Sequence, residues 1–356
     1  MDSGGKKKKT KKESFLETLI VILINVIIVG YIAMKELGGK NASENKLSLS
    51  DINFWFIACG VLCFAVAVAM ETIKYKDMIF TLEKKKMNRV SFECAVLGKY
   101  YDNITPLGAG GQPFQMSYLS KRGMSNGTSG ALPVMGFLSL QTAFILTALT
   151  VFISNKKVAD SYPVIRVSAY VGLGFYIIIP LAIVLFALMP KTLKSVVHWG
   201  CMVLQKIHIL KDGEASSEKV VRVLDEYLVS FNLLKGHRFL FLKQLGYSMI
   251  YQIAIMSIPF FMLRAFGSEA GWWSTFCTVV YVYSAITIIP TPGNSGAAEG
   301  VFYAAFSSLD GSRLFWGMIS WRILVYYSWL LLGLTVVIVD KIEDAIKKRR
   351  AKKSSS

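Results

Sequence analysis

The chain has 356 residues, of which 53% are apolar, and its formal net charge is +17 at pH 7. Its mean hydropathy is +0.46, and several apolar runs approach the roughly 20 residues that a helix needs to cross a bilayer. A soluble globular protein is excluded, because its core would show shorter apolar runs with amphipathic alternation. The sequence therefore predicts an all-α, polytopic integral membrane protein.

The positive charge lies in blocks rather than being spread along the chain. Lys and Arg cluster in residues 6–12, 74–89, 191–238 and 347–353. The positive-inside rule predicts that these blocks face the cytoplasm, which places both termini on the cytoplasmic side of a cell membrane. The same lysines favour anionic lipid head groups. No basic module with interleaved aromatic residues is visible, so nucleic acid is not an expected partner.

The chain opens with a polar, basic arm at residues 1–13, and residues 14–340 are expected to form one transmembrane domain. Residues 15–34 and 52–73 are predicted to be the first two crossings. The basic segment 74–90 is then expected on the cytoplasmic side, where it could lie on the membrane as an amphipathic helix.

A first break in the hydrophobic pattern covers residues 103–113, where Pro and Gly interrupt any continuous helix. Residues 91–120 around it carry charges, and we expect them to form a re-entrant hairpin that enters from the cytoplasmic side. Residues 124–153 and 164–189 are predicted to cross next.

Residues 190–238 form a sizeable polar segment, which we interpret as a cytoplasmic loop with a surface helix near residues 220–234. It holds the three histidines of the chain, His198, His208 and His237. Their spacing fits no metal site, and no candidate nucleophile adjoins them. The sequence therefore predicts neither a metal, nor a cofactor, nor a catalytic residue.

A second break covers residues 290–296 and lies between the apolar segments of a second hairpin, residues 272–309. This hairpin follows a crossing at residues 239–263, so it should enter from the outside. Residues 314–339 cross back to a basic cytoplasmic tail, residues 341–356.

The complete prediction is about six full crossings and two re-entrant hairpins that enter from opposite faces. Broken hydrophobic segments in corresponding places of two halves are typical of transporters built from inverted repeats. Eight shorter crossings would also place both termini on one side, so that alternative stays open.

Two charged residues near the second break are candidates for a site. Glu299 follows the Gly-rich turn at the start of an apolar helix, and Arg322 lies inside the last crossing. Charges at such depth need a partner or a task. Glu299 either caps its helix or pairs with Arg322 or with a cationic substrate group.

Glycines give the first break its own candidate chemistry. Gly108, Gly110 and Gly111 could present backbone amides to a phosphate, although a tight turn that needs positive φ explains them equally well. Lys121 and Arg122 follow, where a lipid phosphate could bind, and the positive-inside bias also explains them.

Two motifs resemble those of a known family. The segment YYDNITPLGAGGQPFQMSYLSKRG (residues 100–123), and the segment PTPGNSGAAEGVFYAAF with a later SWR (residues 290–322), are similar to the two signatures of the lysylphosphatidylglycerol synthase transmembrane, or flippase-like, family. The resemblance covers about residues 15–340. It implies that the site includes Asn103, Pro106, Gly110, Gly111, Gln112, Arg122, Pro292, Gly293, Gly296, Glu299 and Arg322.

The chain departs from the family in two ways. The best-known members carry a soluble domain that transfers lysine from lysyl-tRNA to phosphatidylglycerol, whereas only a basic tail follows Val339 here. Asn294 and Ser295 also stand where the family often has further glycine, which affects the expected shape of that turn.

Lipid translocation is the function that the resemblance implies. The expected substrate is a phospholipid or a lipid-linked anionic head group, with lysylphosphatidylglycerol as the example and resistance to cationic antimicrobial peptides as the cellular consequence. Two alternatives remain: a phosphatidylglycerol lysyltransferase that uses lysyl-tRNA, and a membrane subunit that serves a separate transferase. Self-association is also compatible with the sequence.

Overall fold

The computed structural model describes residues 51–108, 110–155, 163–206, 212–218, 220, 221, 225, 228, 232, 236–287, 289, 291–306 and 314–354. All regular secondary structure in these ranges is helical, and the ranges contain no strand. The predicted arm at residues 1–13 and the predicted first crossing at residues 15–34 lie outside the described residues. The fold is all-α, as the sequence predicts.

Two halves of the described chain repeat one order of elements: a long helix, a helix that ends at a break, a short helix after the break, and a long final crossing. The first half contains α2 (Phe54–Glu83), α3 (Asn88–Ile104), the 3-10 turn η3 (Pro106–Gly108), α4 (Gly111–Lys121) and α5 (Asn126–Ser154). The second half contains α10 (Arg238–Ala265), α11 (Trp272–Ile286), the 3-10 turn η4 (Pro292–Asn294), α12 (Ala297–Phe306), α13 (Leu314–Arg322), the π turn η5 (Ile323–Tyr327) and α14 (Ser328–Ser354). Between them lie α7 (Pro163–Leu188) and α8 (Pro190–Lys206).

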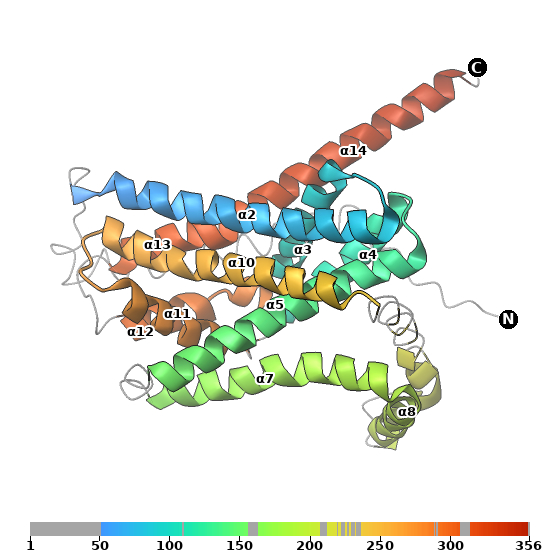
Figure 1. Ribbon diagram of the computed structural model, residues 1–356, viewed down its shortest axis with the longest axis horizontal. Coiled ribbons are helices and arrows are strands. Elements are labelled where there is room, and N and C mark those ends of the chain that lie inside the picture. Colours follow the sequence, from blue (N-terminus) through green and yellow to red (C-terminus); the bar gives the residue numbers. More distant parts are fainter. Residues whose placement is uncertain are drawn as a thin grey trace.

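The first long helices of the two halves, α2 and α10, pack against each other and run antiparallel (Figure 1). At one end the amide of Asn53, just before α2, donates to the carbonyl of Ala265 at 2.9 Å. At the other end the ammonium of Lys243 lies 2.8 Å from the carboxylate of Asp77. We call the latter end the basic end. The two halves are therefore inverted relative to each other.

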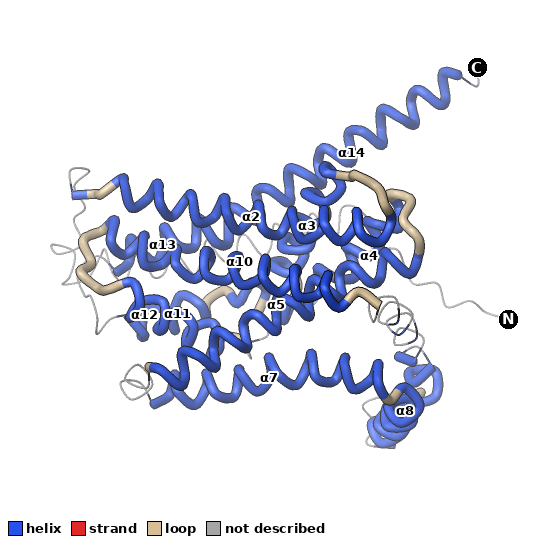
Figure 2. Tube along the Cα trace, in the orientation of Figure 1, coloured by secondary structure: helices blue, strands red, loops and turns tan. Residues whose placement is uncertain are grey.

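The two hairpins enter from opposite ends of the molecule, as predicted. The turn that joins α4 to α5 lies at the basic end, and the loop that joins α10 to α11 lies at the opposite end (Figure 2). The turns η3 and η4 contact each other in the middle of the bundle. Each hairpin thus reaches only part of the way across, and the two breaks meet.

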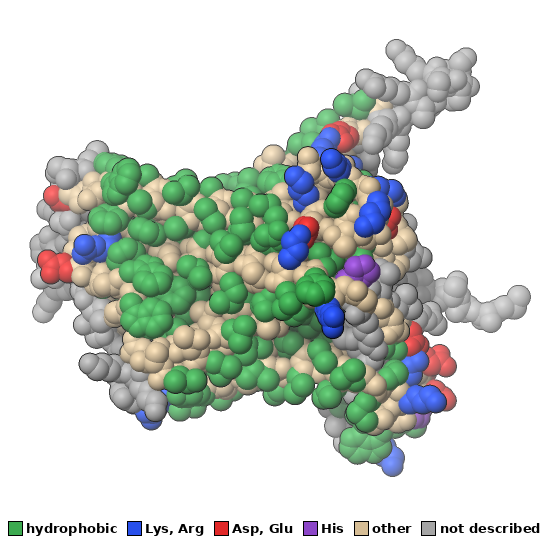
Figure 3. Space-filling model, viewed as in Figure 1, with side chains coloured by type: hydrophobic (Ala, Val, Ile, Leu, Met, Phe, Trp, Pro, Cys, Tyr) green, Lys and Arg blue, Asp and Glu red, His purple; other side chains and the backbone are tan. Residues whose placement is uncertain are grey.

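Five described helical segments are long and apolar enough to cross a membrane. They are Phe54–Glu83, Gly127–Ser154, Ile165–Leu185, Arg238–Ala265 and Leu314–Glu343. Hydrophobic side chains cover the middle of the face in Figure 3, and Lys and Arg gather toward the basic end. This arrangement is that of a multi-pass membrane protein.

The predicted boundary of the second crossing was wrong. We expected residues 52–73 to cross and residues 74–90 to lie on the membrane surface, but α2 continues to Glu83. Lys74 is only 1% exposed, and its ammonium lies 3.1 Å from the carboxylate of Glu71. Because Lys74 pairs inside the bundle, its charge does not mark the water boundary. α2 ends at Lys84, whose left-handed φ of 55° stops the helix.

The predicted loop at residues 190–238 begins with a helix, α8. The proposed surface helix at residues 220–234 falls mostly outside the described residues. At the other end of the chain, α14 continues as a helix through the predicted basic tail to Ser354.

Candidate functional site

The two breaks share one backbone conformation. Each contains a short 3-10 turn that begins with proline, and in each the next two residues are left-handed. The φ angles are 58° at Leu107 and 62° at Gly108 in η3, and 58° at Gly293 and 53° at Asn294 in η4. This conformation costs an L-residue about 1–2 kcal/mol. The surrounding packing must therefore hold both turns in the same strained geometry.

Gly293 is the point where the two breaks touch. A Cβ atom at this position would lie 2.1 Å from the ring carbon Cε2 of Tyr326 and 3.0 Å from the carbonyl oxygen of Asn103. The phenol of Tyr326 in turn donates to that same carbonyl at 3.5 Å. Only glycine fits here, because any side chain would push the last crossing away from the first hairpin.

A buried ion pair joins the second hairpin to the last crossing. The Nε of Arg322 lies 2.6 Å from Oε1 of Glu299, and both side chains are at most 6% exposed. Glu299 belongs to the first turn of α12, whereas Arg322 ends α13. The sequence prediction that these two residues could pair is confirmed by the geometry.

The same carboxylate also caps its helix. Oε2 of Glu299 accepts a hydrogen bond of 2.7 Å from the amide of Gly296, the residue just before α12. A glutamate at the third helical position that bonds the N-cap amide is one half of a capping box. The two interpretations of Glu299 therefore do not compete, because each oxygen performs one of the two tasks.

Aromatic rings and a carbonyl enclose the guanidinium of Arg322. It lies 4.6 Å from the ring centre of Tyr326 and 5.6 Å from that of Trp321. Its Nη2 donates to the carbonyl of Gly293 at 3.4 Å, and Phe302 stacks on Trp321 at 4.5 Å. The arginine thus ties the second break, its helix and the last crossing together in a site with little water.

The amides of the first break are already occupied. The amide of Gly110 donates to Oγ1 of Thr105, and that of Gly111 to Oδ1 of Asp102, both at 2.9 Å. Gln112 is half-buried and has interactions of its own. Together with the positive φ of Gly108, these bonds favour the interpretation as a tight turn over that as a ready phosphate nest.

The structure places Arg122 apart from the breaks. It caps the end of α4, eleven residues beyond Gly111, which corresponds to about 16 Å of helix. Its guanidinium lies 2.6 Å from Asp340 on α14 and 3.2 Å from Glu93 on α3. Of the predicted site residues, Asn103, Gly293, Gly296, Glu299 and Arg322 lie together, whereas Arg122 joins an ionic cluster at the basic end.

Sequence reasoning missed a second group of charges inside the bundle. Glu71 and Lys74 on α2 are buried and paired. Lys99 and Asp102 lie on the last turns of α3, and the Lys99 ammonium lies 4.7 Å above the ring centre of Tyr251. An acid and a lysine three residues apart on one helix were the available signal for the first pair.

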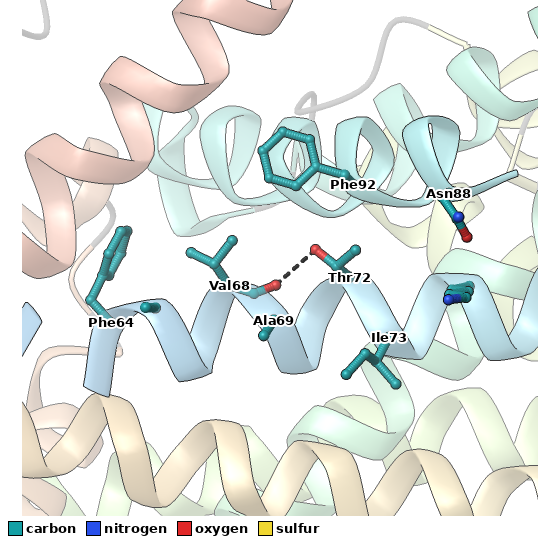
Figure 4. A pocket seen from close by; sticks show the side chains of 9 residues that line it. Phe64, Val68, Ala69, Thr72, Ile73, Asn88 and Phe92 are labelled. Atoms are coloured by element: carbon teal, nitrogen blue, oxygen red, sulfur yellow. Dashed lines mark hydrogen bonds between the residues drawn. The ribbon is translucent and has the colours of Figure 1, made fainter. Parts of the chain in front are cut away.

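An apolar groove of about 530 Å³ lies between α2 and α3 (Figure 4). The hydroxyl of Thr72 points across it but bonds its own helix, at the carbonyl of Val68, 2.8 Å away. The groove is lined by Phe64, Ala65, Val68, Ala69, Thr72, Ile73, Lys76, Asn88 and Phe92. The groove lies apart from the Glu299–Arg322 pair and is apolar except near its lysine and asparagine.

Comparison with known proteins gives two matches. A curated relative, a UPF0104 membrane protein of Archaeoglobus fulgidus, is 23% identical over 286 residues, which is 73% of this chain and 79% of that protein. The family described as the lysylphosphatidylglycerol synthase TM region matches residues 16–333, and this range contains both breaks and the buried ion pair. The chain therefore belongs to the lysylphosphatidylglycerol synthase transmembrane family.

Proposed function

We propose that this protein is a lipid translocase that moves a phospholipid, or a lipid-linked anionic head group, between the two leaflets. The observation that carries this proposal is the meeting of two inverted, broken hairpins beside a buried ion pair. Transporters place their substrate sites near the bilayer midplane at such broken helices. Unpaired backbone at this depth is tolerated where it lines a cavity or is buried in protein.

The chemistry of the pair indicates the class of head group. Separating Glu299 from Arg322 would leave two buried charges without partners, which is costly. A head group that carries both a phosphate and an ammonium can give each residue of the separated pair a new partner of opposite charge. The phosphate would bind Arg322, and the ammonium would bind Glu299. Lysylphosphatidylglycerol has both groups and is the first substrate to test.

The surface of the protein supports a lipid rather than a soluble substrate. The groove on α2 and α3 is lined mainly by apolar side chains, and its single cation, Lys76, adjoins Asp77, whose pair with Lys243 lies at the basic end. An acyl chain can lie along such a wall while the head group reaches the polar interior.

The test is lipid transfer in reconstituted liposomes. Purified protein is placed in liposomes that carry labelled lysylphosphatidylglycerol, phosphatidylglycerol or phosphatidylcholine, and the outer-leaflet label is followed by quenching. We expect faster transfer than in empty liposomes for at least one anionic or aminoacylated lipid. Transfer equal to that in empty liposomes for all three lipids, from protein that remains folded, would overturn the proposal.

The distribution of charge supports one orientation in the membrane. We propose that the basic end faces the cytoplasm of the cell membrane, with both termini on that side. In a variant without native cysteines, a thiol introduced at Lys85 should resist an impermeant reagent in intact cells, whereas one at Glu269 should react. The reverse pattern would invert the assignment.

A second candidate function rests on the family description, which names a synthase. The chain could transfer lysine itself or serve a separate transferase as its membrane subunit. Incubation of purified protein with lysyl-tRNA and phosphatidylglycerol tests the first possibility, and co-purification of a transferase tests the second. If the translocase proposal holds for lysylphosphatidylglycerol, cells without the protein should also become more sensitive to cationic antimicrobial peptides.

A further inference from the structure

A second set of ionisable side chains lies inside the bundle and takes no part in the Glu299–Arg322 pair. Glu71 and Lys74 lie on α2, and Lys99 and Asp102 lie on the part of α3 that leads into the first break. Two acids and two lysines give this cluster a formal charge of zero. Charged groups at such depth are rare in membrane proteins and mark ion or proton pathways by default.

The cluster has a closed part and an open part. The closed part is the Glu71–Lys74 pair, whose ammonium also donates to the carbonyl of Gly136 on α5 at 3.4 Å. The open part is Lys99 and Asp102, which are both only half-buried. Stability alone does not explain the closed part, because well-packed apolar residues are often at least as stable as a buried ion pair.

Asp102 holds the first break together. Its Oδ1 accepts the amide of Gly111, so it bridges the end of α3 to the start of α4 across the turn. The backbone packs tightly here, since a Cβ on Gly111 would lie 2.4 Å from that same oxygen. The turn between them, η3, is exposed on all three of its residues. Asp102 is therefore the acid of the cluster that lies beside an exposed turn.

The charged groups around Asp102 make its interactions depend on whether its carboxylate is protonated. The titratable groups that interact with it electrostatically are Lys99 on its own helix, Glu71 and Tyr75 on α2, and Tyr251 on α10. α4 contributes the amide of Gly111 rather than a charge. The neutral acid would leave Lys99 without this counter-charge and would accept the Gly111 amide less strongly.

On the basis of the proposed lipid translocation, we propose that Asp102 is a proton-binding site that couples lipid movement to a proton gradient. In the charged state Asp102 holds α3 and α4 together across the first break. Uptake of a proton at its carboxylate weakens that bond and releases the first hairpin for movement. The proton returns to water when the carboxylate recovers its bond to Gly111.

A proton fits this site better than a metal ion. No three His, Cys, Asp or Glu side chains gather as a metal site in the part of the chain that the structure describes. Hard cations need several oxygen ligands, and the ammonium of Lys99 close to Asp102 repels them. The chemistry of a single carboxylate beside a lysine suits a transferable proton.

The test measures lipid transfer in the same liposomes with and without a pH gradient imposed across them. We expect the gradient to change the wild-type rate several-fold and a proton ionophore to abolish that change. In Asp102→Asn the ratio of the two rates should fall to about one. Asp77→Asn is the matched control, because Asp77 pairs with Lys243 at the basic end, and it should keep the wild-type ratio.

The outcomes separate this inference from the proposed function. If the wild-type transfer rate is the same with and without the gradient, the coupling is overturned but translocation is left intact. A response that Asp102→Asn retains, or that a sodium gradient produces in place of the proton gradient, also overturns it. Failure to transfer any lipid overturns both. If Asp102→Asn does not fold, the wild-type ratio, together with internal pH recorded by a trapped dye during transfer, still decides.

Discussion

The two breaks have the same turn geometry but are held in different ways. At the second break, Glu299 follows the turn and pairs with Arg322, which comes from the last crossing. At the first break, Asp102 precedes the turn and bonds an amide within its own hairpin. The second break is thus fixed to another part of the bundle, whereas the acid of the first break secures only its own hairpin.

The turns of the two breaks also differ in how far they are buried. The three residues of η3 are exposed, whereas Gly293 and Asn294 in η4 are half-buried, and Gly293 lies against Tyr326 and Arg322. Inverted repeats can therefore use one backbone design for two tasks. In the proposed mechanism the second break is the fixed half of the site, and the first break is the half that moves. This asymmetry is what an alternating-access mechanism needs from two related hairpins.

Breaking the ion pair should have the largest effect. In Arg322→Gln the carboxylate of Glu299 stays buried without its cation, and the loss of one partner of such a pair costs about 3–5 kcal/mol. We expect the protein to insert into membranes but to unfold at a clearly lower temperature and to transfer no lipid above background. Lys85→Gln is the control, because its pair with Glu83 is exposed on the lysine side.

A double variant separates stability from function at the same site. Glu299→Gln combined with Arg322→Gln removes both charges, so much of the lost stability should return while transfer stays at background. Wild-type transfer in the double variant would remove this pair from the site.

A glycine substitution in each break sharpens the comparison. Gly293→Ala meets both a positive φ and the ring of Tyr326 at 2.1 Å, so we expect about 3 kcal/mol or more of destabilisation. Gly108→Ala has the same sign of φ but its nearest neighbour is 3.9 Å away, so the cost should be only about 1–2 kcal/mol. Thermal unfolding in detergent measures both, and equal losses would contradict the division between the fixed and the movable break.

The ionic cluster at the basic end should have the smallest effect. Asp340→Asn removes one of the two partners of Arg122, which is 25% exposed and keeps Glu93. Because water screens this pair, we expect a loss of about 1 kcal/mol or less. The loss should shrink further at high salt, and a loss as large as that of Arg322→Gln would show that the cluster also fixes the first hairpin.

The sequence predicted most of the architecture because proline and glycine interrupt apolar runs in a visible way. It also indicated the pairing of Glu299 with Arg322 as one of three alternatives, since each is an isolated charge at depth in an apolar stretch. It misplaced Lys74, because this residue stands at the start of the basic block 74–89 and so resembles a membrane–water boundary. Its partner, Glu71, lies on the same helix, but only the packed bundle shows that both are enclosed.

The amides of the first break could not be assigned from sequence for a similar reason. Gly110 and Gly111 looked available for a phosphate because glycine amides often are. Their acceptors, Thr105 and Asp102, lie at the end of the preceding helix and bond across the turn. Such a contact depends on the angle between two helices, which composition and spacing do not determine.

The π turn at residues 323–327 follows Arg322 directly and precedes the segment that carries Asp340. A π turn holds about one residue more than an ordinary helical turn, so the residues after it are out of register with a continuous α-helix. This difference of one residue turns the helix beyond residue 327 by about 100° relative to a continuous α-helix. The direction in which Asp340 faces Arg122 at the basic end therefore depends on the extra residue that follows Arg322.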